Sequence, residues 1–220
     1  MLVLAAVIPA LAVLAYIYRA AHHREAPQFV LLLSTLGAIA VLPAGLAERF
    51  LLDVYSQTPE PQSVLLATLV TSFFVAGATE ESIKGLIFWR LVYRKPFFER
   101  PYDGVLYAVA IGMGFATVEN ILYVTSYGLS TAFVRAFTAV PAHALFGIVM
   151  GACFSRAKFD GEPVWRAFIV PALLHGLYDA FAMAQSFFAN ALLIVYLMWL
   201  VRFAYRRAKP LANGLRYRVS

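Results

Sequence analysis

Charged side chains are scarce in this chain of 220 residues. Aspartate, glutamate, lysine and arginine make up 14% of it, against roughly 25% in soluble domains, whereas hydrophobic residues make up 62%. A soluble domain of this length has too little interior to bury so much apolar surface. Disorder is excluded as well, because a disordered chain needs low hydrophobicity and high net charge. The composition therefore indicates an integral membrane protein.

Cysteine is almost absent, and the single Cys153 excludes an internal disulfide. The alternation typical of strands, internal repeats and low-complexity tracts are also missing from the sequence. In lipid, only helices and closed barrels satisfy every backbone hydrogen bond. The sequence therefore predicts an all-α fold, a polytopic transmembrane helix bundle that forms a single integral membrane domain over residues 1–220.

Apolar runs long enough to span a bilayer, which takes ~20 residues, recur along the chain. We expect about seven spans, at Leu2–Tyr18, Gln28–Ala47, Val64–Trp89, Gly104–Tyr127, Thr131–Phe154, Val164–Gln185 and Ser186–Phe203. Gln185, Ser186 and Asn190 predict a tight turn between the last two runs. The first run is expected to be a retained helix, because no basic residue precedes it and Arg19 follows it, the reverse of a signal peptide.

Lysine and arginine alternate between rich and poor loops. The first, third and fifth loops and the tail at about 204–220 are rich, whereas the second, fourth and sixth are poor. By the positive-inside rule, this pattern predicts an outside amino terminus and a cytoplasmic tail in the plasma membrane. The net charge of +6 is then explained by the excess of basic residues on the cytoplasmic side, where they are attracted to anionic lipid. We therefore expect the lipid bilayer, and no nucleic acid, as a partner.

Ionisable residues inside the apolar runs carry the functional information, because each costs roughly 2.5–3.5 kcal/mol to insert and normally faces a partner or a cavity. The polar residues of interest in four successive runs are Glu80, Glu81, Lys84, Glu119, Asn120, His143, His175 and Asp179. Glu80, His143 and His175 lie roughly 15–18 Å from the expected cytoplasmic edge, at ~1.5 Å per residue. Glu119 and Asp179 lie about one turn further out. The common depth predicts one shared site.

Helical spacing indicates which of these side chains meet. Glu80 and Lys84 are four residues apart, so they share a helix face and can form an ion pair. Glu81 is rotated by about 100° from Glu80, which is expected to turn it away from Lys84 and into the bundle centre. His175 and Asp179 are also four residues apart, a spacing that suits a carboxylate that orients an imidazole, or two ligands of one metal.

Proline and glycine accompany one of the histidines. His143, Gly147 and Gly151 form one helical stripe, and small residues on such a stripe allow helices to approach closely. Pro141 stands two residues before His143 and removes a backbone donor there. These residues predict close helix packing and an irregular backbone beside the expected site.

In this order and spacing, the polar motifs resemble the PrsW family of intramembrane proteases, which are distantly similar to the CAAX prenyl-protein proteases. Glu80–Lys84 matches EExxK, Phe115–Asn120 matches FxxxEN, and His143 and His175–Asp179 complete the set. The resemblance covers about residues 70–185, the expected catalytic core. It implies cleavage of membrane-anchored protein substrates, of which anti-sigma factors are the known bacterial example.

The resemblance also implies roles for the residues. The expected catalytic residues are Glu80, Glu81, Glu119, His143 and His175, and the expected supporting residues are Lys84, Asn120 and Asp179. Peptide hydrolysis needs a base for water and a donor for the oxyanion. We expect Glu81 to be the base, because Lys84 is expected to neutralise Glu80.

The motifs leave a zinc mechanism and a glutamate mechanism open. A zinc site would need three protein ligands and an open position, and the candidate ligands are His143, His175, Glu119 and Asp179. No HExxH motif is present, which favours metal-independent chemistry.

Two other classes of function fit the same residues. A proton- or ion-coupled transporter also places Glu, His and Lys at mid-membrane, although transporters commonly contain internal repeats and this sequence shows none. A non-catalytic membrane scaffold of the same fold is the other alternative. Glu81→Gln distinguishes them, because it should stop cleavage by an enzyme and leave partner binding by a scaffold unchanged.

Overall fold

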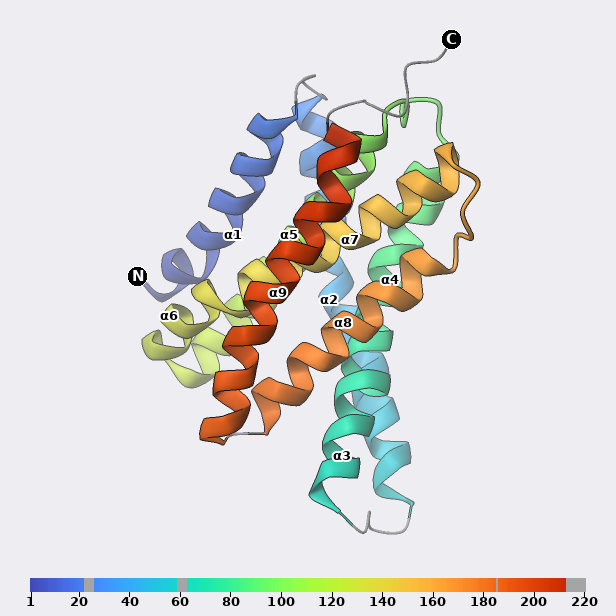
Figure 1. Ribbon diagram of the computed structural model, residues 1–220. Helices are drawn as coiled ribbons and strands as arrows, with labels where there is room; N and C mark the ends of the chain where they lie inside the picture. The colour runs from blue at the N-terminus through green and yellow to red at the C-terminus, as the bar shows by residue number, and fades with distance from the viewer. Residues whose placement is uncertain (22–25, 59–62, 185, 213–220) are drawn as a thin grey trace.

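The computed structural model describes residues 1–21, 26–58, 63–184 and 186–212, and within these ranges the chain is helical and contains no strand. The helices are α1 (Leu2–Ala20), α2 (Pro27–Ser56), α3 (Val64–Val70), α4 (Ala78–Phe88), α5 (Pro101–Tyr127), α6 (Leu129–Phe137), α7 (Ala139–Phe159), α8 (Arg166–Met183) and α9 (Phe187–Ala212). Figure 1 shows an up-and-down bundle in which α1 and α9 run in the same direction. The expected all-α transmembrane bundle is confirmed.

Six helices are long and apolar enough to cross a membrane in the part of the chain that the structure describes. They are α1, α2, α5, α9 and the longer helical stretches Val64–Tyr93 and Leu129–Phe159. The remaining expected span, the sixth (Val164–Gln185), corresponds to α8, which packs against α4, α7 and α9. Arg166, His175 and Asp179 lower its mean hydropathy.

The third span is one continuous helix, Val64–Tyr93, that changes its hydrogen-bonding pattern twice. The Ser63 hydroxyl caps its start by accepting a hydrogen bond from the backbone N–H of Leu66. Two π-helical segments, η1 (Thr71–Gly77) and η2 (Trp89–Tyr93), lie on either side of α4. Such segments insert an extra residue into the turn and occur frequently at functional sites. Here they flank the helix that carries both glutamates of the EExxK motif.

The fifth predicted span is broken in two. A single helix was expected over Thr131–Phe154, but α6 ends and α7 begins around Thr138, whose φ of −121° and ψ of −75° are not helical. Pro141 explains the break, because it has no N–H to donate to the carbonyl four residues earlier and its ring clashes with that carbonyl. At the other end, Gly128 has a φ of +87°, which glycine adopts readily, and it separates α6 from α5.

Two other helices are longer than predicted. α2 continues to Ser56 instead of ending at Ala47, so Glu48 and Arg49, which were expected in a loop, are helical. α9 continues through the start of the predicted tail to Ala212. Residues 213–220 of that tail lie outside the described residues, as does Gln185 of the predicted turn, whereas Asn190 lies within α9.

α5 is the central helix, and it packs against α1, α2 and α7. Most of its residues are buried. Gly147 and Gly151 of α7 lie directly against the α5 backbone, as the glycine stripe predicted. This close packing fixes the depth of α7, and therefore of His143, relative to α5.

Candidate active site

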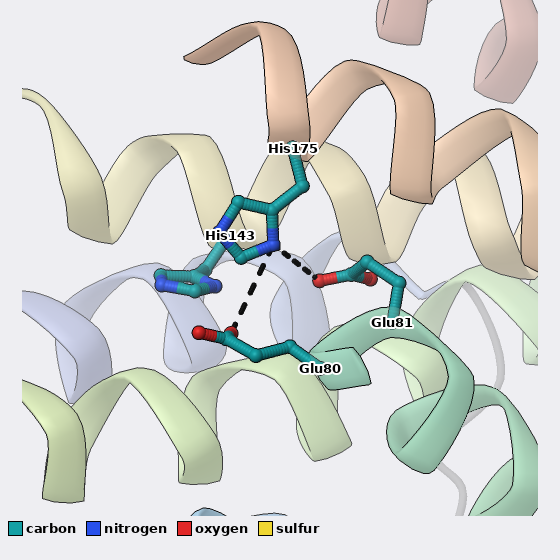
Figure 2. Close-up of side chains that lie close together, drawn as sticks. All are labelled: Glu80, Glu81, His143 and His175. Carbon is teal, nitrogen blue, oxygen red and sulfur yellow. Dashed lines mark hydrogen bonds and ion pairs between the residues drawn. The ribbon is translucent and has the colours of Figure 1, made fainter. Parts of the chain in front are cut away.

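Five buried ionisable residues from three helices meet inside the bundle. These residues, called the active-site cluster below, are Glu80, Glu81 and Lys84 of α4, His143 of α7 and His175 of α8. Each of them is at most 6% exposed. Figure 2 shows the two glutamates and the two histidines turned toward one another. The convergence expected from their common depth is therefore present.

Lys84 lies at the centre of the cluster. Its Nζ is 2.9 Å from Glu80 Oε2, 2.7 Å from Glu81 Oε1 and 3.3 Å from His143 Nδ1. The three ammonium donors thus meet three acceptors. The expectation that Glu81 turns away from Lys84 was wrong, because residues three apart on a helix are neighbours just as residues four apart are.

His175 links the glutamates of α4 to α8. Its Nδ1 is 3.0 Å from Glu81 Oε1 and 3.8 Å from Glu80 Oε2, contacts that Figure 2 marks with dashed lines. Its Nε2 is 3.4 Å from Asp179 Oδ2, as the four-residue spacing predicted. The Phe146 ring stacks on the imidazole with centroids 4.8 Å apart. Both edges of the ring thus meet carboxylates while one face is covered.

His143 links the cluster to α5. Its Nε2 is 2.8 Å from Glu119 Oε2, while its Nδ1 contacts the Lys84 ammonium. Because an ammonium group can only donate, Nδ1 accepts, and Nε2 carries the proton that is donated to Glu119. Glu119 therefore fixes the tautomer of His143 from outside the cluster.

Arg135 is a site residue that the sequence analysis missed. It lies near the start of the expected span Thr131–Phe154, where no site role was expected for it. In the structure it lies on α6, and its Nη2 is 2.9 Å from the same Glu119 oxygen that contacts His143. Its Nε donates to Asn120 Oδ1, and the Asn120 amide donates to the Ala6 carbonyl. Asn120 thus joins α1, α5 and α6, and supports the site only through Arg135.

A cleft of about 730 Å³ reaches this network from the surface. Residues of α2, η1, α4, α5 and α8 line it, and most of them are apolar. Glu80, Glu119 and Asp179 are among the lining residues, whereas Glu81, His143 and His175 are not. Of the two adjacent glutamates, Glu80 is therefore the one that a molecule in the cleft would meet.

Comparison with known proteins identifies the family of this chain. The model of a family described as "PrsW family intramembrane metalloprotease" matches residues 25–205. This chain belongs to the PrsW family. Protease PrsW of Bacillus subtilis is 35% identical over 213 residues, with 93% of each chain covered. Protease PrsW of Shouchella clausii is 37% identical, with 81% of each chain covered. No solved structure matches the chain.

Membership of the PrsW family confirms the resemblance drawn from the motifs. It makes the chain an intramembrane peptidase, whose substrates are proteins within a bilayer. The helices that carry the matched motifs, α4, α5, α7 and α8, are also the helices that build the site.

A metal ion of the kind that the PrsW family description implies would find suitable ligands here. Glu80, Glu81, His143 and His175 each offer one ligand atom, and these atoms lie within 4.8 Å of one another. Two imidazoles and two carboxylates are ordinary ligands of zinc. The second nitrogen of each imidazole contacts a carboxylate, which is the usual outer shell of a protein metal site.

The ligand set differs from the one expected from the sequence. Glu119 and Asp179 were candidate ligands, but both lie outside the four-residue group. They contact the far nitrogens of His143 and His175 and so orient these rings. Glu80 and Glu81, whose side chains are less exposed than those of Glu119 and Asp179, are the carboxylates in this group.

Gly77 allows α8 to approach α4 closely enough for His175 to reach Glu81. A Cβ atom at Gly77 would lie 2.7 Å from the Ala172 carbonyl oxygen and from the Gly176 nitrogen, both on the α8 backbone. We therefore expect Gly77→Ala to push the helices apart, to destabilise the fold by about 1–3 kcal/mol and to reduce peptidase turnover. Thermal unfolding in detergent and cleavage of a test substrate would measure both effects.

Gly45→Ala is the matched control for this experiment. A Cβ atom at Gly45, on α2, would meet nothing within 4 Å. This substitution should leave the unfolding temperature unchanged or raise it slightly, since alanine favours the helix over glycine. Equal unfolding temperatures for the two variants would contradict the role assigned to Gly77.

Proposed function

We propose that this chain hydrolyses a peptide bond of a membrane-anchored protein at the active-site cluster, with Glu80 as the base that activates water. The observation that carries this proposal is a buried group of two carboxylates and two imidazoles, one of whose carboxylates, Glu80, also lines the cleft. Glu80, Glu81, Glu119, His143 and His175 keep the catalytic importance expected from the motifs. The assignment of the base moves from Glu81 to Glu80.

Glu81, His143 and His175 would hold a divalent cation such as zinc, which leaves Glu80 free as a base. A catalytic zinc site commonly has three protein ligands and an open position, so one of the four possible ligands is available for another role. When bound, the ion would lower the pKa of a water molecule and polarise the scissile carbonyl. The missing HExxH motif favoured metal-independent chemistry, but the ligand set and the family description support the metal alternative.

The residues around the cation site would transfer protons, stabilise charge and position the ligands. Glu80 would take a proton from the attacking water and return it to the leaving amine. The Lys84 ammonium, 2.9 Å from Glu80, offsets the negative charge and adds positive potential where the oxyanion develops. Glu119 and Asp179 hold the imidazoles of His143 and His175 in place.

A reconstituted cleavage assay would test this function. Purified protein in liposomes, supplied with zinc, would be given a membrane-anchored substrate such as an anti-sigma factor with a tag at each end. We expect two fragments whose masses report one cleavage position, and loss of cleavage when a chelator removes the metal. A scaffold would bind the substrate intact, and a transporter would move protons or ions without cleaving it, and either result would contradict the proposal.

We also propose that the amino terminus lies outside and the tail in the cytoplasm of the plasma membrane. The alternating basic loops support this orientation, and the parallel directions of α1 and α9 agree with an odd number of spans. Reporter fusions at Pro61 and Ser220 are therefore expected to report opposite sides, with position 61 outside and position 220 inside. Two reporters on the same side would disprove this topology.

A further inference from the structure

Glu48 of α2 lines the same cleft as three acidic residues that form ion pairs, Glu80, Glu119 and Asp179. Glu80 pairs with Lys84, Glu119 with Arg135 and Asp179 with His175. Within residues 1–21, 26–58, 63–184 and 186–212, no group forms a hydrogen bond or ion pair with the Glu48 carboxylate. Arg49 also lines the cleft, but it forms no ion pair with Glu48.

The surroundings make this unpaired carboxylate costly. Leu42, Leu46 and Leu52, from the same helix, line the cleft with it, and such apolar walls do not replace the water that a charged group loses. Among the charged groups that act on it, Glu80 and Glu119 repel its negative charge, whereas His175 and Lys84 attract it. A cation placed in the cleft would relieve both penalties.

We propose that Glu48 is a specificity residue that binds a lysine or arginine side chain of the substrate, close to the scissile bond. The inference rests on the proposed function, because it places the substrate in the cleft that Glu80 lines. The substrate segment that fits has apolar residues against the leucines of α2 and one basic side chain directed at Glu48. A long basic side chain suits this position, because its methylene groups pack on apolar surface while its charged end reaches the carboxylate.

The test compares membrane-anchored substrates that differ only in one residue near the cleavage position, which is lysine, glutamine or glutamate. The varied residue is placed in turn at each of a few positions on either side of the scissile bond. At the position that lies opposite Glu48, we expect the wild-type protein to cleave the lysine substrate with a kcat/KM about tenfold or more above that of the glutamate substrate. Glu48→Gln should remove this preference, and Glu48→Lys should reverse it.

The ratio of kcat/KM for the lysine substrate to kcat/KM for the glutamate substrate is measured within one protein preparation, so partial loss of folded protein does not affect this ratio. Asp53→Asn is the matched control, because Asp53 is an exposed residue of the same helix and does not line the cleft. This variant should keep the wild-type preference. Equal cleavage of all substrates, or a preference unchanged by Glu48→Lys, would overturn the inference and leave the proposed function intact. No cleavage of any substrate would overturn both.

Discussion

Replacing Glu80 by glutamine is expected to lower turnover by about 10² or more while the bundle remains folded and still binds metal. Glutamine keeps the size of the side chain and can still accept a hydrogen bond from Lys84, but it cannot take a proton from water. The ligands assigned to the metal, Glu81, His143 and His175, are unchanged in this variant. Single-turnover cleavage and the metal content of the purified protein measure the two properties separately.

Glu81→Gln is the matched comparison, because it makes the same chemical change at the adjacent position. Glu81 is 1% exposed, does not line the cleft and contacts both Lys84 and His175. This variant is expected to lose metal as well as turnover. If Glu81→Gln keeps its metal and is inactive while Glu80→Gln cleaves normally, the two acids are reversed. If both variants cleave normally, neither glutamate is the base.

Lys84→Met is expected to destabilise the protein by about 3–5 kcal/mol, because it leaves two buried carboxylates without their shared counter-ion. Methionine has a similar length, so packing against the Phe115 ring, which lies 4.0 Å from the ammonium, is largely retained. The loss of stability should therefore come from the missing positive charge of Lys84 and not from altered packing. Unfolding of the metal-free protein by denaturant in detergent micelles would measure it.

Lys95→Met is the control for this experiment. Lys95 is exposed and follows η2, where its charge is solvated, and surface substitutions of this kind usually change stability by less than about 0.5 kcal/mol. The Lys84 variant should unfold at a clearly lower denaturant concentration than the Lys95 variant. Coincident unfolding curves would show that Glu80 and Glu81 do not depend on the ammonium group.

The meeting of Glu80, His143 and His175 could be predicted because two local quantities determine it. Distance along a helix gives depth in the membrane, and the cost of burying a charge requires polar groups at one depth to face each other. Both quantities can be read from the sequence without knowing how the helices are arranged. The pairing of His175 with Asp179 is predictable for the same reason.

Arg135 and Glu48 could not be placed from the sequence, because both lie near the end of an apolar run. Charged residues in such positions are typical of loops and of membrane boundaries, so neither residue was expected in the site. In the structure, α2 extends beyond its apolar run, and Pro141 splits the next span so that α6 turns Arg135 toward Glu119. Which glutamate faces the cleft was also unpredictable, because the answer depends on where α2 packs.

The composition of α8 has a consequence for biosynthesis. In the described part of the chain, α8 corresponds to an expected span but is not among the six helices that are long and apolar enough to cross a membrane, and His175 and Asp179 lower its hydropathy. An aspartate at the centre of a helix opposes entry into the bilayer by roughly 2.5–3.5 kcal/mol, and Asp179, about one turn before the end of α8, opposes it less strongly. His175 contacts Glu80 and Glu81 of α4 once α8 packs there, and Asp179 contacts His175 on the same helix. We therefore expect integration of α8 into the membrane to depend on assembly with α4, which is made about ninety residues earlier in the chain.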